Sequence, residues 1–279
     1  MKFGVNTFIW TVSFDRSHLP LLPEIKEHGF DGIEVSLFRP ANFAVADIRR
    51  GLEENDLECT ICGVLTPDLS MISADAAVRH KTLSHMKDCV KVAADVGAEV
   101  IAGPLYSPVG YLPGRRRTTD EWNWAVECYQ ALGPVLENNG VEIAIEPLNR
   151  FETYFLNTAE DAVALCEAIH HPRVGILFDT FHANIEEKNL GQAFRKVGPH
   201  LKHVHACEND RGIPGTGHVE WNDVFEALRA VKYDRWLTIE SFGFTQGELS
   251  AAASIWRDIA PTPESIAFEG MKFLKRHMA

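Results

Sequence analysis

The chain has 279 residues, of which 46% are hydrophobic, and its 27 Lys and Arg against 39 Asp and Glu leave a formal net charge of −12. This acidic balance argues against nucleic acid and anionic membrane surfaces as partners, because both attract basic proteins. No segment approaches 18 uninterrupted apolar residues, and the N-terminus has no apolar signal-peptide block, so we expect a cytoplasmic protein.

Short β-rich runs alternate with longer segments of helical spacing along the whole chain. The pattern predicts strands at 2–9, 32–37, 58–65, 99–106, 141–146, 174–179, 201–207 and 236–241. It predicts helices near 17–28, 43–55, 75–96, 118–139, 158–170, 189–197, 220–231 and 263–277. We expect Thr118 and Thr158 as N-caps, and Gly29, Gly97 and Gly140 at helix ends.

Eight β/α pairs without a Pro- or Ser-rich linker predict an α/β fold, a (β/α)8 TIM barrel that forms one domain over residues 1–279. A doubly wound sheet is the alternative. It is disfavoured because no G-x-G-x-x-G motif follows the first predicted strand.

The six cysteines are scattered among apolar neighbours, unlike the dense cysteines of a small secreted domain. Cys59 and Cys62 form a C-x-x-C, but a strand directs side chains three positions apart to opposite faces. We therefore expect reduced, packed thiols and no shared metal at this pair.

Four successive predicted strands end on, or close to, a residue that can bind a metal. These residues are Glu146, Asp179, His205 and Glu240. Each alone also fits a cap partner or a core histidine, but in a barrel the strands' carboxyl ends meet at one mouth. Three carboxylates there would repel one another without a cation, and three oxygen donors with one imidazole suit Mn²⁺, Mg²⁺ or Co²⁺. We expect one divalent metal.

Further polar residues follow these positions in the predicted loops. Glu152, His182 and Arg211 are placed to hydrogen-bond a hydroxyl-rich substrate, and Arg211 also to balance negative charge on an oxygen. Each is also compatible with a solvated loop residue.

The motifs E-P-L-N-R-F-E at 146–152 and D-T-F-H-A-N-I-E-E at 179–187, with His205, Arg211, P-G-T-G at 214–217 and Glu240, resemble the ketose 3-epimerases. This D-tagatose/D-allulose 3-epimerase group belongs to the xylose-isomerase-like barrel superfamily. The resemblance covers nearly the whole chain. It implies one Mn²⁺, Mg²⁺ or Co²⁺ held by Glu146, Asp179, His205 and Glu240, with Mn²⁺ favoured. It also implies substrate oxygens held by Glu152, His182 and Arg211, and a homodimer or homotetramer.

The chain departs from this group in two regions that would line the far end of the substrate. Asn6-Thr7-Phe8 stands where relatives acting on D-fructose or D-tagatose often carry a tyrosine, and the loop over 106–117 has its own sequence. That loop contains Arg115, Arg116 and Arg117, which would either grip a phosphate or form a solvated run or subunit contact. We favour the second interpretation.

The hypothesis is a metal-dependent inversion at C3 of a free ketose of the D-tagatose, D-allulose, D-fructose or L-ribulose type. Glu146 and Glu240 would flank C3 and exchange protons with an enediolate. The alternatives are an aldose–ketose, hydroxypyruvate or inosose isomerase, an inosose dehydratase, a 3-keto-glycoside epimerase, and a non-catalytic sugar-binding protein. A zinc endonuclease is disfavoured because strands three and four do not end on histidines.

Overall fold

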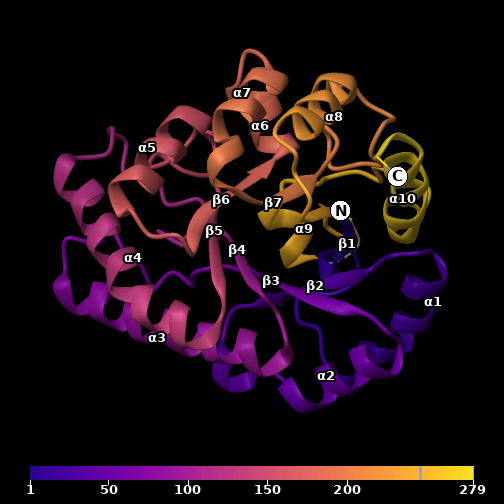
Figure 1. Cartoon of the computed structure of the whole chain (residues 1–279), viewed down its shortest axis with the longest axis horizontal. Coiled ribbons are helices and arrows are strands. Elements are labelled where there is room, and N and C mark those ends of the chain that lie inside the picture. The colour runs from indigo at the N-terminus through magenta and orange to yellow at the C-terminus, as the bar shows by residue number, and fades with distance from the viewer. Residues whose placement is uncertain (245–246, 279) are drawn as a thin grey trace.

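The computed structural model describes residues 1–244 and 247–278, within which eight parallel strands close into a barrel (Figure 1). The strands are β1 Lys2–Asn6, β2 Gly32–Leu37, β3 Glu58–Gly63, β4 Val100–Gly103, β5 Glu142–Ile145, β6 Val174–Asp179, β7 Leu201–Ala206 and β8 Trp236–Ile239. Neighbours in the barrel are neighbours in the chain, and β1 closes the circle on β8 with Val5 opposite Ile239. The predicted (β/α)8 barrel is confirmed.

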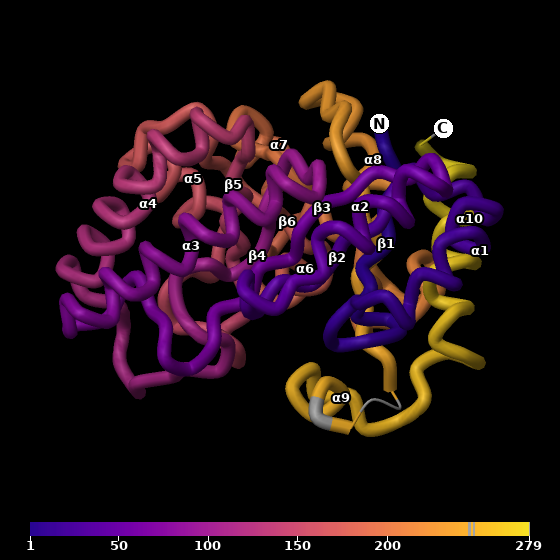
Figure 2. The backbone as a smooth tube through the Cα atoms, turned by 90° about the horizontal axis from the view of Figure 1, so that it is seen from below, coloured from indigo at the N-terminus to yellow at the C-terminus, as the bar shows by residue number. Residues whose placement is uncertain are grey.

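Helices surround the barrel in a ring (Figure 1). The helices of the described chain are α1 Leu22–Glu27, α2 Val45–Glu54, α3 Ala76–Val96, α4 Thr119–Asn139, α5 Ala159–Ile169, α6 Thr180–Glu186, α7 Leu190–Val197, α8 Trp221–Ala230, α9 Glu248–Ala252 and α10 Pro263–Met278. The short α9 lies over the middle of the strands in Figure 1 and projects beyond the ring in Figure 2. It therefore covers one end of the barrel. Among the described helices, none has both the length and the apolar character needed to cross a bilayer.

Local chemistry fixes several predicted helix boundaries. The Thr118 side chain accepts from the Glu121 N–H and the Glu121 side chain reaches back, which completes a capping box at α4. Thr158 caps α5 in the same way through the Asp161 N–H. Gly140 ends α4 with a φ of 70°, a left-handed conformation that glycine adopts at little cost.

Several elements differ from the sequence prediction, and β3, β4, β5, β7 and β8 end one to three residues earlier than predicted. The first strand ends at Asn6 instead of residue 9, because the Asn6 side chain accepts from the Phe8 N–H and starts a 3₁₀ turn over Thr7–Ile9. The helix predicted at 17–28 is a 3₁₀ segment, Arg16–Leu21, followed by α1. The short helices α6 and α9 were absent from the prediction. Asp179 ends β6 and also caps α6, so no polar loop separates the two elements.

The barrel interior changes character along its axis. A buried apolar layer, Val100, Ala102, Ala144 and Leu177, fills part of it. Toward the carboxyl ends of the strands the buried side chains become polar, with Glu34, Thr60, His203 and His205. Because burying polar groups is costly unless they have partners, this end of the barrel is where a functional site is expected.

Candidate active site

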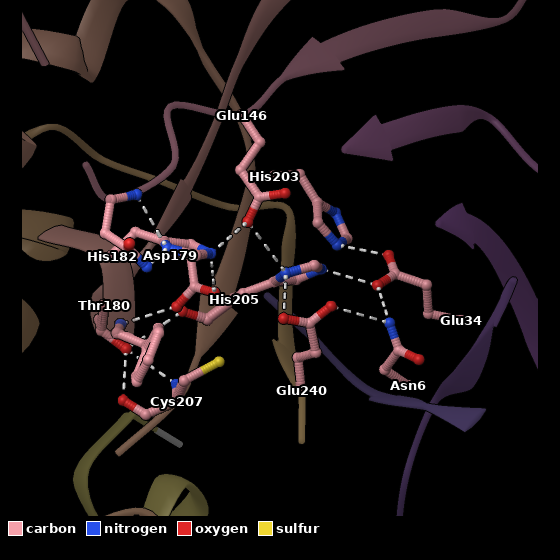
Figure 3. A network of polar contacts seen from close by, with 12 residues as sticks. Asn6, Glu34, Glu146, Asp179, Thr180, His182, His203, His205, Cys207 and Glu240 are labelled. Atoms are coloured by element: carbon pink, nitrogen blue, oxygen red, sulfur yellow. Dashed lines mark hydrogen bonds and ion pairs between the residues drawn. The ribbon is translucent and has the colours of Figure 1, made fainter. Parts of the chain in front are cut away.

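The structure brings the four predicted metal ligands together. Glu146 directly follows β5, Asp179 ends β6, His205 lies in β7 and Glu240 directly follows β8. One ligand atom from each lies within 4.8 Å of the others, and all four residues are buried (Figure 3). Parallel strands in a closed barrel present their carboxyl ends at one mouth, which explains how residues almost 100 positions apart converge.

Arg211 lies among these carboxylates. Its Nη1 donates to Asp179 Oδ2 and to Glu240 Oε2, each at 2.8 Å, and the residue is only 5% exposed. The backbone of Arg211 has a φ of 65° in the loop after β7. The predicted substrate contact therefore also supplies positive charge to the carboxylate cluster.

Burial and mutual repulsion set the protonation of the cluster. Burial, and then the charge of Glu240, raise the pKa of Glu146 well above its usual range. Burial also opposes ionisation of Glu240, but His205 and Arg211 outweigh it and lower the pKa of that carboxyl. Burial opposes charge on His205, yet Glu240 and Glu34 raise its pKa well above the ordinary value. The site thus favours positive charge at its centre.

Glu34 on β2 contacts His205 on the side of the ring that faces away from Glu146 and Glu240. It was not among the predicted site residues. The Glu34 Oε1 atom lies 2.7 Å from His205 Nε2, while Oε2 lies 2.8 Å from His203 Nε2 (Figure 3). Burial opposes ionisation of Glu34, but His205 and His203 keep its pKa well below the usual range. A charged residue in the middle of the apolar run 32–37 was the signal that could have revealed it.

The two other predicted substrate contacts, His182 and Glu152, share a partner in Asn149. The Asn149 backbone N–H donates to His182 Nδ1 at 3.1 Å, and its side-chain amide donates to Glu152 at 2.8 Å. Burial lowers the pKa of His182 to about 3, so the ring is neutral, and Arg211 Nη2 lies 3.2 Å from its Nε2. That atom lies 3.7 Å from Glu146 Oε1 and 3.8 Å from Asp179 Oδ2.

A cavity of about 150 Å³ opens above these residues. Five predicted site residues line it, namely Glu146, Glu152, His182, Arg211 and Glu240. Its remaining lining is mostly apolar, with Phe8, Phe38, Val64, Val109, Phe242 and Leu249 among the residues. A larger cavity of about 530 Å³, lined by residues such as His170, His200 and Lys202, contains none of the predicted site residues. The chemistry therefore points to the smaller cavity.

Other polar motifs have structural partners. Arg115 pairs with Glu121 and Arg117 with Asp161, both at 2.7 Å, and neither arginine lines the 150 Å³ cavity. Glu208 accepts from the backbone of Gly215 and Val219 and so holds its own loop. The six cysteines are free and buried, and Cys59 and Cys62 share no candidate metal cluster in the described part of the chain.

Comparisons with known proteins agree with this geometry. Residues 22–277 match the xylose isomerase-like TIM barrel family. A probable ketose 3-epimerase of Synechocystis sp. is 36% identical, covering 99% of this chain and 96% of the relative. An L-ribulose 3-epimerase of Mesorhizobium japonicum is 31% identical, covering 98% and 93%. The crystal structure of a Methylomonas sp. D-allulose 3-epimerase in complex with D-allulose superposes with a TM-score of 0.94 at 26% identity, covering 99% and 97%.

The chain therefore belongs to the xylose isomerase-like TIM barrel family. Within that family it belongs with the ketose 3-epimerases, which are carbohydrate isomerases.

Proposed function

We propose that this chain inverts C3 of a free ketose, with Glu146 and Glu240 as its acid/base pair. The observation that carries the proposal is the convergence of these two carboxylates with Asp179 and His205 beneath one cavity. The names of its relatives support a substrate of the D-allulose (also called D-psicose), D-tagatose or L-ribulose type.

The donor set fits a divalent metal, and we propose Mn²⁺, with Mg²⁺ and Co²⁺ as alternatives. His205 Nδ1 is buried, makes no hydrogen bond with the described residues, and lies 3.3 Å from Glu240 Oε2. Glu146, Asp179, His205 and Glu240 would hold the ion through three carboxylates and one imidazole, a set that suits these metals. When bound, the metal would stabilise negative charge on the sugar oxygens next to C3 and so acidify the C3 proton.

Epimerisation requires two proton-transferring groups. A single base usually returns the proton to the face from which it came, whereas inversion needs a donor on the opposite face of the planar enediolate. Glu146 comes from β5 and Glu240 from β8, so the two carboxylates approach the site from different strands. In one direction one removes the proton and the other returns one, and the reverse reaction exchanges their roles.

The remaining polar residues would hold and orient the sugar. The neutral His182 ring directs Nε2 toward the ligand cluster, where it can hydrogen-bond a sugar hydroxyl. Glu152 can accept from a hydroxyl, and Arg211 can stabilise negative charge on an oxygen. The apolar side of the cavity would exclude water from the reacting carbon.

A panel of free ketoses incubated with the Mn²⁺-loaded protein tests the proposal. We expect C3 epimers to accumulate, as measured by chromatography, and activity to disappear after chelation. An aldose product would favour an aldose–ketose isomerase. Binding of ketoses without turnover of any member of the panel would favour a sugar-binding protein.

The same ketoses and their phosphate esters, assayed in parallel, test the substrate class. We expect the free sugars to be preferred, because Arg115 and Arg117 are paired with carboxylates. A preference for the ester by more than about tenfold, or 1.4 kcal/mol, would overturn this expectation.

Two further properties belong to the proposal. The free, buried cysteines support a reducing compartment, and we propose the cytoplasm. We also propose a homodimer or homotetramer, which sedimentation of the purified protein would test.

A further inference from the structure

Behind the candidate ligands, Glu34 forms a fully buried junction inside the barrel. Its Oε1 contacts His205 Nε2 at 2.7 Å and accepts from Asn6 Nδ2 at 2.9 Å. Its Oε2 accepts from Thr60 Oγ1 at 2.9 Å and contacts His203 Nε2 at 2.8 Å. These partners come from β1, β3 and β7, so the Glu34 carboxylate connects β2 to three other strands in the polar part of the barrel. Figure 3 shows its contacts with Asn6, His203 and His205.

The contact with Glu34 determines which atom His205 offers to the site. Because an ionised carboxylate only accepts hydrogen bonds, His205 must keep its proton on Nε2. Nδ1 is then the nitrogen that a metal ion would bind in place of a proton, and it lies 3.3 Å from Glu240 Oε2 and 3.9 Å from Glu146 Oε1. Carboxylates commonly orient metal-binding histidines through the second ring nitrogen.

Asn6 extends the junction to Glu240. Its Oδ1 accepts from the Phe8 N–H at 2.9 Å, which turns the amide nitrogen toward the interior. Nδ2 then lies 2.9 Å from Glu34 Oε1 and 3.3 Å from Glu240 Oε1, so one amide group contacts both carboxylates. With Oε1 of Glu240 held in this way, Oε2 faces His205 Nδ1 and Arg211 Nη1.

We propose that Glu34 and Asn6 are positioning residues for the candidate metal and acid/base site. Glu34 directs His205 Nδ1 into the site, Asn6 holds Glu240, and the Asn6–Glu34 hydrogen bond connects these two contacts. The inference rests on the proposed function, because it assigns the orientation of one metal ligand and of one acid/base group to residues that do not line the cavity.

Two variants test the Glu34–His205 contact and the Asn6–Glu240 contact separately. Glu34→Gln keeps the shape of the side chain but replaces one carboxylate oxygen by an NH₂ group. That NH₂ group then faces a hydrogen-bond donor, where the wild-type oxygen accepted a hydrogen bond. We expect the Kd of Glu34→Gln for Mn²⁺, measured by calorimetry without sugar, to rise about 10- to 100-fold. Asn6→Ala removes the amide contacts with Glu240 and with Glu34 Oε1 but leaves the Glu34–His205 contact in place. We expect kcat to fall about 10- to 100-fold with a smaller change in KM.

A matched control removes a carboxylate at the other end of the barrel. Glu142 begins β5 and forms ion pairs with Lys202 and Arg235. Glu142→Gln should lower the melting temperature but leave the Kd for Mn²⁺ unchanged. Asn55→Ala, which removes a hydrogen bond from the Asn55 side-chain amide to Gly51 O at the end of α2, is the control for Asn6→Ala. Excess Mn²⁺ should restore part of the activity of Glu34→Gln, which a purely structural defect would not allow.

The outcomes distinguish this inference from the proposed function. A Glu34→Gln protein whose Kd for Mn²⁺ stays within about threefold of wild type overturns the positioning role of Glu34. An equal loss of Mn²⁺ affinity in Glu142→Gln overturns it as well. Should Glu34→Gln not fold, Asn6→Ala decides, and unchanged kcat and Kd in that variant overturn the proposal. If wild-type protein binds Mn²⁺ but epimerises no ketose, the proposed function is refuted. The role of Glu34 is still tested in that case, because the Kd values of the variants for Mn²⁺ do not depend on epimerase activity. Wild-type protein that binds no divalent metal overturns both.

Discussion

Glu240 combines two roles at a single residue, since the proposal makes it a metal ligand and a proton-transferring group. Glu240→Gln keeps a carbonyl oxygen that can still face the metal but cannot exchange a proton at neutral pH. We expect kcat to fall by about 10²- to 10⁴-fold while Mn²⁺ affinity falls much less. Metal content by mass spectrometry and initial rates measure the two losses. Equal losses would reduce Glu240 to a ligand, and full activity of metal-free wild-type protein would remove the metal from the mechanism.

Arg211 is the residue whose charge offsets the buried carboxylates of Asp179 and Glu240. Arg211→Met keeps much of the apolar stem but leaves both carboxylates without this partner. We expect the free energy of unfolding to fall by about 3–5 kcal/mol in EDTA, the usual loss when one member of a buried ion pair is removed. The loss should be smaller in saturating Mn²⁺, because a bound cation compensates the same carboxylates. Denaturant titrations in both buffers measure it, and equal losses would show that the two cations do not substitute for each other.

At the scale of elements, the N-terminus of α4 depends on an ionised Glu121. Burial opposes its ionisation, but hydrogen bonds from Arg115, Thr118 and Tyr154 lower its pKa to about 2. The folded pKa lies below the unfolded value, so the unfolded state binds more protons between them. The stabilisation is therefore present above about pH 4.3 and is lost as the pH falls toward 2.

Glu121→Gln tests this contribution, because Gln preserves the capping box and removes the charge. We expect a loss of about 1–2 kcal/mol at pH 7 that shrinks as the pH falls through the window from 4.3 to about 2. Urea titrations across this range measure the difference from wild type. Glu127→Gln, at an exposed position of the same helix, is the control and should change nothing. A difference that persists unchanged at about pH 2 would contradict the interpretation.

Much of the element order was predictable because hydrophobic period and caps are local properties of the sequence. The four candidate ligands were found for the same reason: each stands at or near the end of an apolar run. Their partners were harder to find. Asn6 is the last residue of β1, and its role depends on Glu34 and Glu240, which are far away in the chain. Helix α6 was missed because Asp179 serves both as the end of β6 and as the cap of the helix.

At the scale of the whole molecule, closure of the barrel creates the site. β1 pairs with both β2 and β8, so Asn6 lies between Glu34 and Glu240 although 234 positions separate it from the latter. The apolar interior below and the short helix α9 above leave the polar cluster between them, and α9 contributes Leu249 and Ala252 to the cavity wall. The geometry of the acid/base pair thus depends on the closed circle of strands, so its proton-transfer activity requires the assembled barrel.

A single turnover in D₂O tests that chemistry directly. Proton abstraction places the C3 hydrogen of the substrate on one carboxylate, while the proton returned to the opposite face comes from the other, which exchanges with solvent. The product should therefore carry deuterium at C3 and none at C1. A hydride shift between C1 and C2, as in an aldose–ketose isomerase, retains the migrating hydrogen and introduces no label. Proton NMR of the sugar pool resolves both positions, and enzyme loaded with Mn²⁺ in H₂O is the control. A C3 epimer whose C3 stays protonated would rule out the two-carboxylate scheme of Glu146 and Glu240, because one group would then have carried the same hydrogen across both faces.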